Sequence, residues 1–555
     1  MNQVTSSTDD ADTRLGDQLI AHDVVTQVVI DYARQKQKIE GGSLGRLLME
    51  LGFASGKDIG RALARQWNIR FVDVALLPVP EVDVASAFNR NVCLTHRFLP
   101  LRHDGEFVEV VIGDATPEAI ADVVRRRIGM PVRFLQGEFD KVAALTQQHY
   151  YFAENPPEKL INSEVRRLEA DVDRAYSPGK LLDYILHLAV RERATDVHIA
   201  PTAHSSTVLM RVDGVMRPMF ALSRALDRLV SFVKLQSEMD ASEQRLPQDG
   251  SFTATVLETA YTIRVSTLIS ELGERMVMRL LPERGDLDKL EDLGFLPEDV
   301  LLMTRVFARP HGLILITGPT GSGKSTTLHA ALRMQPLVER NVVTVEDPVE
   351  YRVPVACQTQ VNRRAGYDFS IAMRHFLRHD PDIILVGEIR DAETARAALD
   401  ASSTGHLVLS TLHVGGIFGV VPRLKLLGVD GDTIAENLVA VINQRLVRRI
   451  CPDCRIGRPA TAAEQAWLGA PSSTLFHGAG CSHCRGSGFL GRLPVYEMMI
   501  VQRDLADAIA ADRPRGILRD IAERDGLRPI VKLSRQRVLA GETTVEEIER
   551  AVGNY

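Results

Sequence analysis

Apolar residues recur at helical spacing in the first part of the chain, and they do so twice. Residues 14–37 and 43–66 align with each other, so that Leu15 corresponds to Leu44. In both copies apolar positions lie three and four residues apart, which is the spacing of one helix face. We therefore predict a small helical domain of two paired hairpins over residues 1–70.

Two α/β patterns follow the helical repeats. Over residues 71–150, apolar runs at 107–112 and 132–135 predict strands on either side of a helix at 117–127, which makes a small α/β domain without a catalytic signature. Residues 151–177 are rich in charge and contain a Pro-Pro pair, so they are predicted to be a linker or a polar connecting helix.

A second α/β domain is predicted over residues 178–285. The dipeptides Asp213-Gly214 and Asp249-Gly250 are typical of turns between strands. The predicted elements are an amphipathic helix over residues 181–193 and strands over residues 196–199, 207–212, 251–257, 261–266 and 275–281.

The region 286–450 contains short, fully apolar runs separated by helical patterns, as in a buried parallel sheet. It is predicted to be an α/β domain, followed by a cysteine-containing domain over residues 451–495 and a helical region over residues 496–555. The predicted strands of the sheet are residues 313–317, 342–345, 383–386 and 407–412.

Length and composition restrict the class of protein. A chain of 555 residues is long enough for several domains. Charged residues make up 25% and the net charge is −6, without a long block of one sign, so a general nucleic-acid binder is excluded. No apolar run approaches the roughly 18–20 residues of a membrane span, and the N-terminus is polar, so a cytoplasmic location is expected.

The clearest chemical motif directly follows the run at 313–317. A G-x-x-x-x-G-K-S segment lies between a predicted strand and a predicted helix at 326–332, which is the context of a phosphate-binding loop rather than of a chance glycine-rich turn. Lys324 can bridge the β- and γ-phosphates of a nucleoside triphosphate, and the Ser325 hydroxyl can hold Mg²⁺. The predicted nucleotide-binding residues are Gly318, Pro319, Thr320, Gly321, Ser322, Gly323, Lys324, Ser325 and Thr326.

Acidic residues and a histidine follow the other predicted strands. Glu346, Asp347 and Glu350 come after the run at 342–345, and Glu388 and His413 come after the next two runs. Since the carboxyl ends of parallel strands meet at one edge, these groups are expected to converge on Mg²⁺ and the γ-phosphate. Taken singly, each acid could be a helix cap or a surface group; taken together they indicate an active site. Spacing alone does not decide which acid of the first group is the base.

Four of the six cysteines form two C-x₂-C pairs separated by a long segment. This pattern presents four thiolates to one tetrahedral ion and leaves no position open for catalysis, so a structural zinc site is predicted. A redox C-x-x-C would be expected alone and beside a βαβ unit. His483 is expected to face solvent. The four predicted ligands are Cys451, Cys454, Cys481 and Cys484.

The motifs together resemble the secretion ATPases of the type II secretion and type IV pilus assembly class. They are GPTGSGKST at 318–326, TVEDPVEY at 344–351, ILVGEIRD at 384–391, TGHLVLSTLH at 404–413 and the tetracysteine motif, in that order. The resemblance implies a multidomain α/β protein with a RecA-like P-loop core, preceded by a sensor-like α/β domain. It also implies a cytoplasmic homohexamer that uses ATP and Mg²⁺.

The resemblance also implies roles for single residues. It maps the catalytic glutamate of the family onto Glu350 and its Walker B glutamate onto Glu388. Glu388 would then hold magnesium together with Ser325. The arginines that reach ATP from the preceding domain map onto Arg264 and Arg279, and the histidine box maps onto His406 and His413. The chain departs from the family in having Ser251 in place of an arginine and Val-Gly-Gly at 414–416 in place of Thr-Asn-Asp.

For the whole protein, the resemblance implies a motor that powers a pilus or pseudopilus for type II secretion or type IV pilus extension. The implied partners are an inner-membrane platform protein and the cytoplasmic domain of a membrane-anchored assembly protein, which would hold it peripherally at the inner membrane; no nucleic acid is implied. A nucleotide-gated scaffold is the alternative. Retraction motors of the superfamily lack the long N-terminal region and the tetracysteine motif.

The helical repeats resemble segments that bind cyclic di-GMP in some members of the family. The first copy keeps Arg14-Leu15-Gly16, whereas the second has Ser43 at the position of the arginine, and Asp23 stands where the second copy has Gly52. The sequence leaves two interpretations of the repeats open: a cyclic di-GMP site and a docking module without a ligand.

Overall fold

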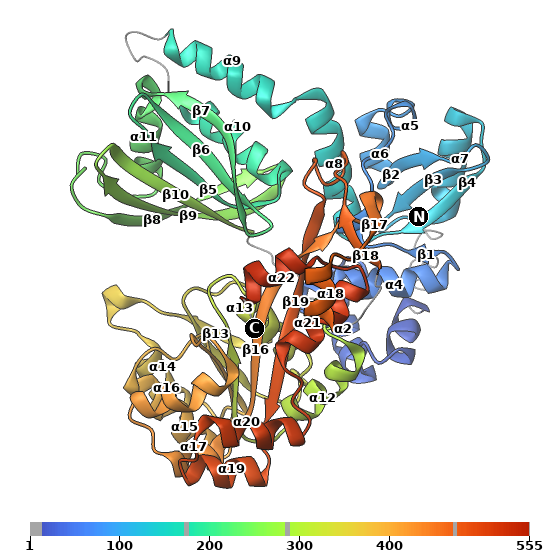
Figure 1. Cartoon of the computed structure of the whole chain (residues 1–555). Coiled ribbons are helices and arrows are strands. Elements are labelled where there is room, and N and C mark those ends of the chain that lie inside the picture. The colour runs from blue at the N-terminus through green and yellow to red at the C-terminus, as the bar shows by residue number, and fades with distance from the viewer. Residues whose placement is uncertain (1–13, 171–176, 283–288, 354, 470–473, 554–555) are drawn as a thin grey trace. The chain divides into compact units, whose positions relative to one another are not determined.

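A computed structural model describes residues 14–170, 177–282, 289–353, 355–469 and 474–553. The chain divides into two compact units, one of residues 56–285 and the other of residues 1–55 together with 286–555 (Figure 1). Among the described residues, no helix is both long and apolar enough to cross a membrane.

The repeats at the start of the chain are helical, as predicted. A helix over residues 14–21 precedes α2 (Gln27–Glu40) and α3 (Leu44–Glu50). The aligned residues Leu15 and Leu44 are both buried, so the repeat reflects packing. Ser43, at the position of Arg14 in the first copy, caps α3 by accepting a hydrogen bond from the Arg46 N–H.

The first α/β domain contains a four-stranded sheet with the order β1-β4-β3-β2. The strands at 107–112 and 132–135 and the helix at 117–127 are confirmed to within a residue or two as β3, β4 and α7. β2 was not predicted, because Pro100 interrupts its pattern; it lies at the sheet edge, where proline is tolerated. The elements are α4 (Gly56–Gln66), β1 (Arg70–Phe71), α5 (Val82–Ser86), α6 (Arg90–His96), β2 (Phe98–His103), β3 (Val108–Ile112), α7 (Pro117–Ile128), β4 (Val132–Gln136) and α8 (Lys141–Glu154).

The charged segment after this domain is largely helical, as α9 (Pro157–Glu169). The second α/β domain has an antiparallel six-stranded sheet with the order β7-β6-β5-β10-β9-β8. The helix at 181–193 and the five predicted strands are confirmed. The edge strand β7 was missed, because Pro218 interrupts its alternation of apolar and polar residues. The elements are α10 (Gly179–Arg191), β5 (Ala194–Pro201), β6 (Ser205–Val212), β7 (Val215–Ser223), α11 (Arg228–Gln236), β8 (Gln248–Val256), β9 (Thr259–Ser270) and β10 (Gly273–Pro282).

One of the two predicted turns is wrong. Asp213-Gly214 joins β6 to β7 with positive φ at both residues, as a tight hairpin requires. Asp249-Gly250, however, lies inside β8, where Gly250 pairs with Val265. A Cβ at Gly250 would stand 2.2 Å from the Ser237 carbonyl oxygen, so glycine is needed there for close backbone approach and not for a turn.

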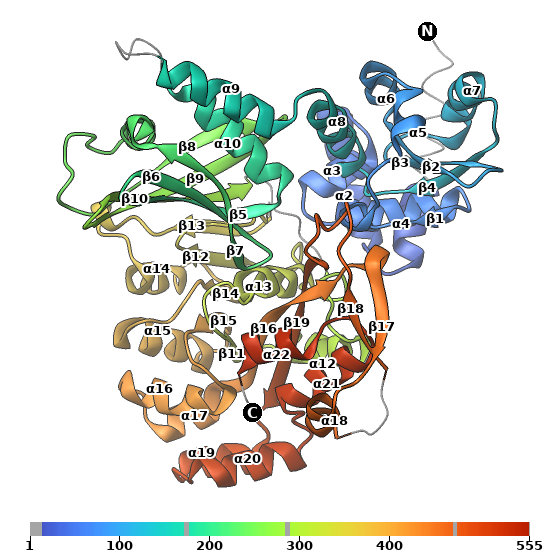
Figure 2. The ribbon, with the colours of Figure 1, turned by 45° about the horizontal axis from the view of Figure 1, so that its top comes forward.

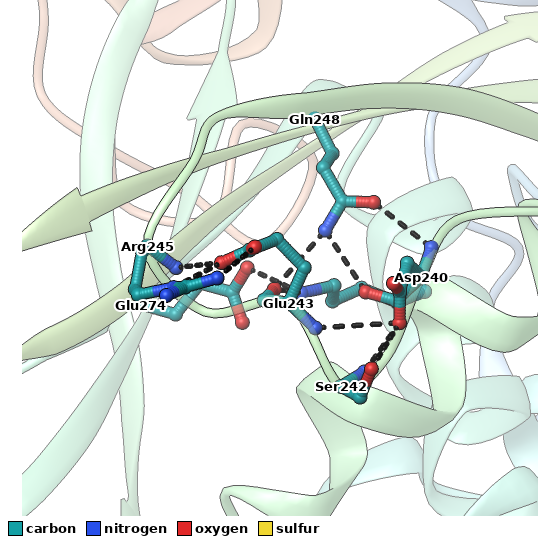
Figure 3. A network of polar contacts seen from close by, with 7 residues as sticks. Asp240, Ser242, Glu243, Arg245, Gln248 and Glu274 are labelled. Carbon is teal, nitrogen blue, oxygen red and sulfur yellow. Dashed lines mark hydrogen bonds and ion pairs between the residues drawn. The ribbon is translucent and has the colours of Figure 1, made fainter.

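A buried lysine anchors the connection between α11 and β8. The Lys234 side chain is 0% exposed, and its Nζ donates to Glu274 Oε1 at 2.8 Å and to the Glu243 carbonyl oxygen at 2.6 Å. Figure 3 shows the surrounding polar contacts, in which Asp240 accepts from the backbone N–H groups of Ser242 and Glu243. The charge is compensated and its donors are directed at oxygens, as a buried ammonium requires.

The domain that follows is built on a seven-stranded sheet with the order β13-β12-β14-β15-β11-β16-β19 (Figure 2). All neighbouring pairs are parallel except β16 with β19. The four predicted strands are confirmed. The strands are β11 (Gly312–Thr317), β12 (Val342–Glu346), β13 (Cys357–Gln360), β14 (Ile383–Val386), β15 (Leu407–Leu412), β16 (Leu438–Ile450) and β19 (Phe489–Ile500).

Alternate residues of these strands enter two separate cores. Leu313 and Leu315 pack with α14, α15, α16 and α17 on one face, whereas Ile314 and Ile316 pack with α12 and α13 on the other. Both faces are covered, which explains the continuous apolar runs. The helices are α12 (Pro297–Phe307), α13 (Lys324–Arg333), α14 (Phe369–Phe376), α15 (Ala392–Ser403), α16 (Val420–Leu426) and α17 (Gly431–Asn437).

The cysteine-containing segment is inserted between two strands of this sheet. It leaves β16 and returns as β19, which pairs antiparallel with β16 and crosses the predicted domain boundary at residue 495. The predicted C-terminal helices are present. The remaining elements are β17 (Arg455–Pro459), α18 (Ala462–Leu468), β18 (Thr474–Gly478), α19 (Arg503–Ala510), α20 (Arg515–Arg524), α21 (Ile530–Leu539) and α22 (Val545–Val552).

Replacing the buried lysine tests the role of the polar network in Figure 3. Lys234→Ala leaves the Glu274 carboxylate without its ammonium partner and opens a cavity, so the free energy of unfolding should fall by about 3–5 kcal/mol. Urea unfolding of the purified chain, followed by circular dichroism and tyrosine fluorescence, measures the change. Arg245→Ala is the matched control, because Arg245 pairs with Glu243 but its side chain is 87% exposed. Equal destabilisation by the two changes would contradict the assignment.

Candidate nucleotide and metal sites

The predicted phosphate-binding loop joins the buried central strand β11 to α13. Gly318, Gly321 and Gly323 all have positive φ, which L-residues rarely adopt, so these glycines are required by the backbone path. A Cβ at Gly318 would also stand 2.5 Å from the Gln444 carbonyl oxygen. The loop therefore has the conformation that directs backbone N–H groups at an anion in front of a helix N-terminus.

Lys324 is folded back onto the loop. Its Nζ donates to the carbonyl oxygens of Gly318 and Pro319, each at 3.0 Å, and the residue is 9% exposed. Burial lowers the pKa of Lys324 to about 8, although the charges of Glu388 and Glu350 act in the opposite direction. The two glutamates therefore lie close enough to Lys324 to influence its charge, which brings three of the predicted catalytic residues to one place.

Glu388 and His413 follow two adjacent parallel strands, β14 and β15. His413 Nε2 lies 3.4 Å from one Glu388 oxygen, and Arg390 contacts the other at 2.6 Å. Burial, together with the positive charge of Lys324, lowers the pKa of His413, so a neutral imidazole is favoured beside the loop. These positions agree with a magnesium-site carboxylate at Glu388.

The three acids at the end of β12 and directly after it, Glu346, Asp347 and Glu350, have different surroundings. Glu346 is buried and engaged with the Thr344 hydroxyl and with other groups described below. Asp347 pairs with Arg363 at 3.2 Å. Glu350 is exposed, as is Asp347, and its charge acts on Lys324. The assignment of Glu350 as the base stays a prediction.

Two residues of this site were missed in the sequence. The Gln444 side chain donates to the Ser322 carbonyl oxygen at 2.7 Å and accepts from the Thr327 hydroxyl at 3.1 Å, which ties the phosphate-binding loop to β16. Arg445 donates to the Gly415 carbonyl oxygen at 2.5 Å, in the loop after His413. The available signal was a polar Asn-Gln-Arg interruption in an otherwise apolar strand.

Other predicted residues lie elsewhere. His406 stands at the amino end of β15 and His413 at its carboxyl end, so the histidine box does not form one cluster. Arg264 and Arg279 are cross-strand neighbours in the sheet of the other unit, and Ser251 is the next residue in the same row. Arg279 Nε donates to Asp196 Oδ1 at 2.8 Å, so its guanidinium is held in place within its own domain.

The four predicted zinc ligands converge. Their sulfur atoms all lie within 4.8 Å of one another, and three of the separations are 3.7–3.8 Å, for Cys451 with Cys481, Cys454 with Cys484, and Cys481 with Cys484. Four thiolates around one Zn²⁺ at about 2.3 Å would have sulfur–sulfur distances of about 3.8 Å. The donor set and its spacing therefore fit a tetrahedral structural zinc ion.

Backbone N–H groups support this assignment. Gly480 donates to Cys454 Sγ at 3.3 Å, and Cys481 and Gly488 donate to Cys484 Sγ at 3.2 and 3.3 Å. Such bonds stabilise thiolates as metal ligands. The prediction that His483 faces solvent is wrong: its ring is largely covered and Nδ1 contacts Asp453 Oδ2 at 2.8 Å, bridging the two cysteine pairs from outside.

A phosphate-binding loop at the carboxyl edge of a parallel sheet, with glutamates after the neighbouring strands, defines a P-loop nucleoside triphosphatase. Residues 174–550 match the family described as type II/IV secretion system protein, and residues 67–156 match the MshEN domain. The chain belongs to the type II/IV secretion ATPase family, and the predicted family and fold class are confirmed. The MshEN match begins after the helical repeats and covers the first α/β domain.

Individual relatives agree with this family. The type IV pilus assembly ATPase PilB of Thermus thermophilus is 34% identical over 534 residues, which are 92% of this chain and 59% of that protein. The type II secretion system protein E of Aeromonas hydrophila is 36% identical over 491 residues, 85% of this chain and 96% of that protein. This chain thus spans about three fifths of the Thermus protein and nearly all of the Aeromonas protein.

A solved structure supports the fold. The ATPase DotB of Legionella pneumophila superposes with a TM-score of 0.50 and 21% identity, covering 68% of this chain and 95% of that one. At this identity the likeness concerns the fold alone.

The zinc assignment predicts the metal content of the purified chain. We expect close to one zinc ion per chain by mass spectrometry of the metal, and loss of zinc in Cys481→Ser, because three thiolates hold Zn²⁺ more weakly than four. The melting temperature of that variant should fall by about 5 °C or more, since metal binding contributes to folding. Cys357→Ser is the matched control, because Cys357 is exposed and apart from the cluster. Retention of zinc in Cys481→Ser would contradict the assignment.

The position of Lys324 predicts a pH dependence of nucleotide binding. Its pKa of about 8 in the free protein means that the ammonium is lost as the pH rises above 8, whereas bound phosphates favour the protonated form. Affinity for ATP should therefore fall by up to about tenfold per pH unit above 8, with proton uptake on binding. Calorimetry at pH 7–9.5 in two buffers measures both. Lys324→Ala should bind weakly with a flat pH response; a flat response in the unmodified chain would refute the prediction.

Proposed function

We propose that this chain is a mechanochemical ATP hydrolase of a secretion or pilus assembly machine and works as a homohexamer. The observation that carries the proposal is that the phosphate-binding loop, Glu388 and Glu350 follow the carboxyl ends of β11, β14 and β12, parallel strands of one sheet. A protein that only binds nucleotide needs the loop and the lysine, but it has no need for two glutamates beside the phosphates. Their presence favours turnover over binding alone.

In this proposal the loop N–H groups and Lys324 hold the triphosphate. Ser325 and Glu388 would hold Mg²⁺, which when bound offsets the charge of the phosphate oxygens. A water molecule attacks the γ-phosphorus, the bond from this phosphorus to the β–γ bridging oxygen breaks, and Glu350 accepts the proton of the water. The products are ADP and inorganic phosphate.

The proposal gives a further role to two strand arginines. Arg264 and Arg279 stay a prediction as contacts to ATP, and their cross-strand pairing presents two guanidinium groups on one face of a rigid sheet. Positive charge there would offset charge on the phosphates in the transition state. The Asp196–Arg279 bond pre-orients one of the two groups.

The names of the relatives suggest the machine. One matched relative is a type IV pilus assembly ATPase and another a type II secretion protein, at 34% and 36% identity. We infer that hydrolysis drives an inner-membrane platform protein that assembles a pilus or pseudopilus. The cytoplasmic domain of a membrane-anchored assembly protein would dock the hexamer at the inner membrane. The similar identities do not separate the two machines, and cyclic di-GMP as a ligand of the N-terminal region stays a prediction.

Removal of either glutamate should separate binding from turnover. Glu350→Gln and Glu388→Gln should each lower kcat for ATP hydrolysis by about 10²-fold or more, because a base and a magnesium-site carboxylate are lost. Affinity for an ATP analogue without magnesium should change little. Glu436→Gln, an exposed glutamate on α17, is the control. Normal turnover in Glu388→Gln would refute the site assignment.

The same assay, run against oligomer mass, tests the motor. Specific activity that rises with hexamer formation and requires Mg²⁺ supports a ring-shaped motor. Tight ATP binding without turnover in any oligomer would instead indicate a nucleotide-gated scaffold.

A further inference from the structure

A buried histidine lies directly behind the phosphate-binding loop and has no part in the chemistry above. His329 is on α13, one helical turn after Ser325, and its side chain is 3% exposed. Its Nε2 lies 3.1 Å from Glu346 Oε2, and the Glu346 side chain is 5% exposed. Burying two titratable side chains this deeply costs desolvation energy, so the arrangement needs a physical role.

The hydrogen-bond partner of His329 Nδ1 determines whether this ring nitrogen carries a proton. Nδ1 lies 2.8 Å from the Ser325 carbonyl oxygen, and since a carbonyl can only accept, Nδ1 carries a proton. Nε2 lies 3.1 Å from a Glu346 carboxylate oxygen, outside hydrogen-bond geometry. Burial opposes ionisation of Glu346, yet His329, Thr344 and Gln358 together bring its pKa below the usual range. Glu346 is therefore held as a carboxylate beside the His329 ring.

The same pair is connected to the loop that carries Glu350. Gln358 donates from its side-chain amide to Glu346 Oε1 at 3.1 Å and to the Tyr351 carbonyl oxygen at 2.8 Å. The Tyr351 ring packs against His329 with centroids 4.9 Å apart. The Tyr351 hydroxyl is 3.0 Å from the Thr326 hydroxyl, in the phosphate-binding loop.

Glu350 is thus flanked by tethered backbone on both sides. On its amino side the Val349 N–H donates to the Gln360 side chain at 3.3 Å, and on its carboxyl side Tyr351 is held as described. The loop from 347 to 351 is not part of a strand or helix, so these tethers fix its position. The tether at Tyr351 leads back, through Gln358 and Glu346, to the face of α13 that presents His329.

We propose that His329 is a positioning residue for hydrolysis: through Glu346 and Tyr351 it holds the loop of Glu350 in register with the helix of Lys324 and Ser325. The proposal rests on the proposed function, because it takes Glu350 as the base. A catalytic base has to stand within hydrogen-bond reach of the attacking water, and a displacement of about 1 Å can cost two orders of magnitude in rate.

The distinguishing property of a positioning residue is a separation of kcat from binding. Loss of the His329 ring removes one of the groups packed against the buried Glu346 carboxylate, and the easiest relief is movement of Glu346 and the loop after it. Lys324 and the phosphate-binding loop are held by other contacts, those of Lys324 Nζ with Gly318 and Pro319 and of Gln444 with Ser322. The chemical step should therefore suffer while affinity for nucleotide is preserved.

The test compares His329→Phe, Glu346→Gln and the double variant in the full-length chain. His329→Phe should lower kcat about tenfold or more, with less than about a threefold change in the dissociation constant of a fluorescent ATP analogue. The double variant should lose less than the product of the single losses, because it leaves no unpaired charge. His329→Gln, which keeps an N–H donor toward Glu346, should retain most of kcat and serves if His329→Phe does not fold.

Further variants distinguish a failure of the positioning role from a failure of the proposed function. His375→Phe changes an exposed histidine on α14 and should behave as the unmodified chain. If Glu350→Gln is inactive while His329→Phe and His329→Gln keep full kcat, the positioning role is overturned and the proposed function stands. If kcat and affinity fall together in proportion to the loss of folded protein, His329 is only structural and the inference is also overturned. If Glu350→Gln turns over normally, the proposed function itself fails.

Discussion

The parallel pairing of β11 with β15 and β16, and of β15 with β14, is the constraint on which the rest of the site depends. Because all these strands run in the same direction, their carboxyl ends meet at one edge. The phosphate-binding loop follows the central strand, and the acidic and polar groups follow its neighbours. Residues separated by more than 100 positions in the chain, such as Ser322 and Gln444, are thereby brought into contact.

Burial of polar groups is the second determinant of this edge. Lys324, Glu346 and Gln444 are largely removed from water, and each is matched by specific oxygen or nitrogen partners. Such matching restricts the loops to one arrangement, since any shift would leave a buried donor or acceptor unpaired. The depressed pKa of Lys324 is a consequence of the same burial, and it makes the free site ready to gain a proton together with an anion.

Outside the nucleotide site, two local polar devices add to the apolar cores. The cysteine cluster closes an insertion that leaves and re-enters the same sheet between β16 and β19, beside an apolar cluster that includes Leu468 and Leu475. In the other unit the Lys234 ammonium holds an irregular connection by its charge. Both stabilise segments that backbone hydrogen bonds within helices and sheets do not hold by themselves.

The sequence by itself determined the four buried strands that precede the phosphate-binding loop and the other motifs, the zinc ligands and the family, because these depend on local spacing and on residue types with narrow chemistry. Tertiary structure alone decided that Glu346 is the buried acid among those after β12, that His406 and His413 lie at opposite ends of one strand, and that Gly250 serves close packing. It also decided the contacts of Gln444 and His329. Strand order and register, which local patterns do not encode, set each of these, because they bring together residues that are distant in the chain.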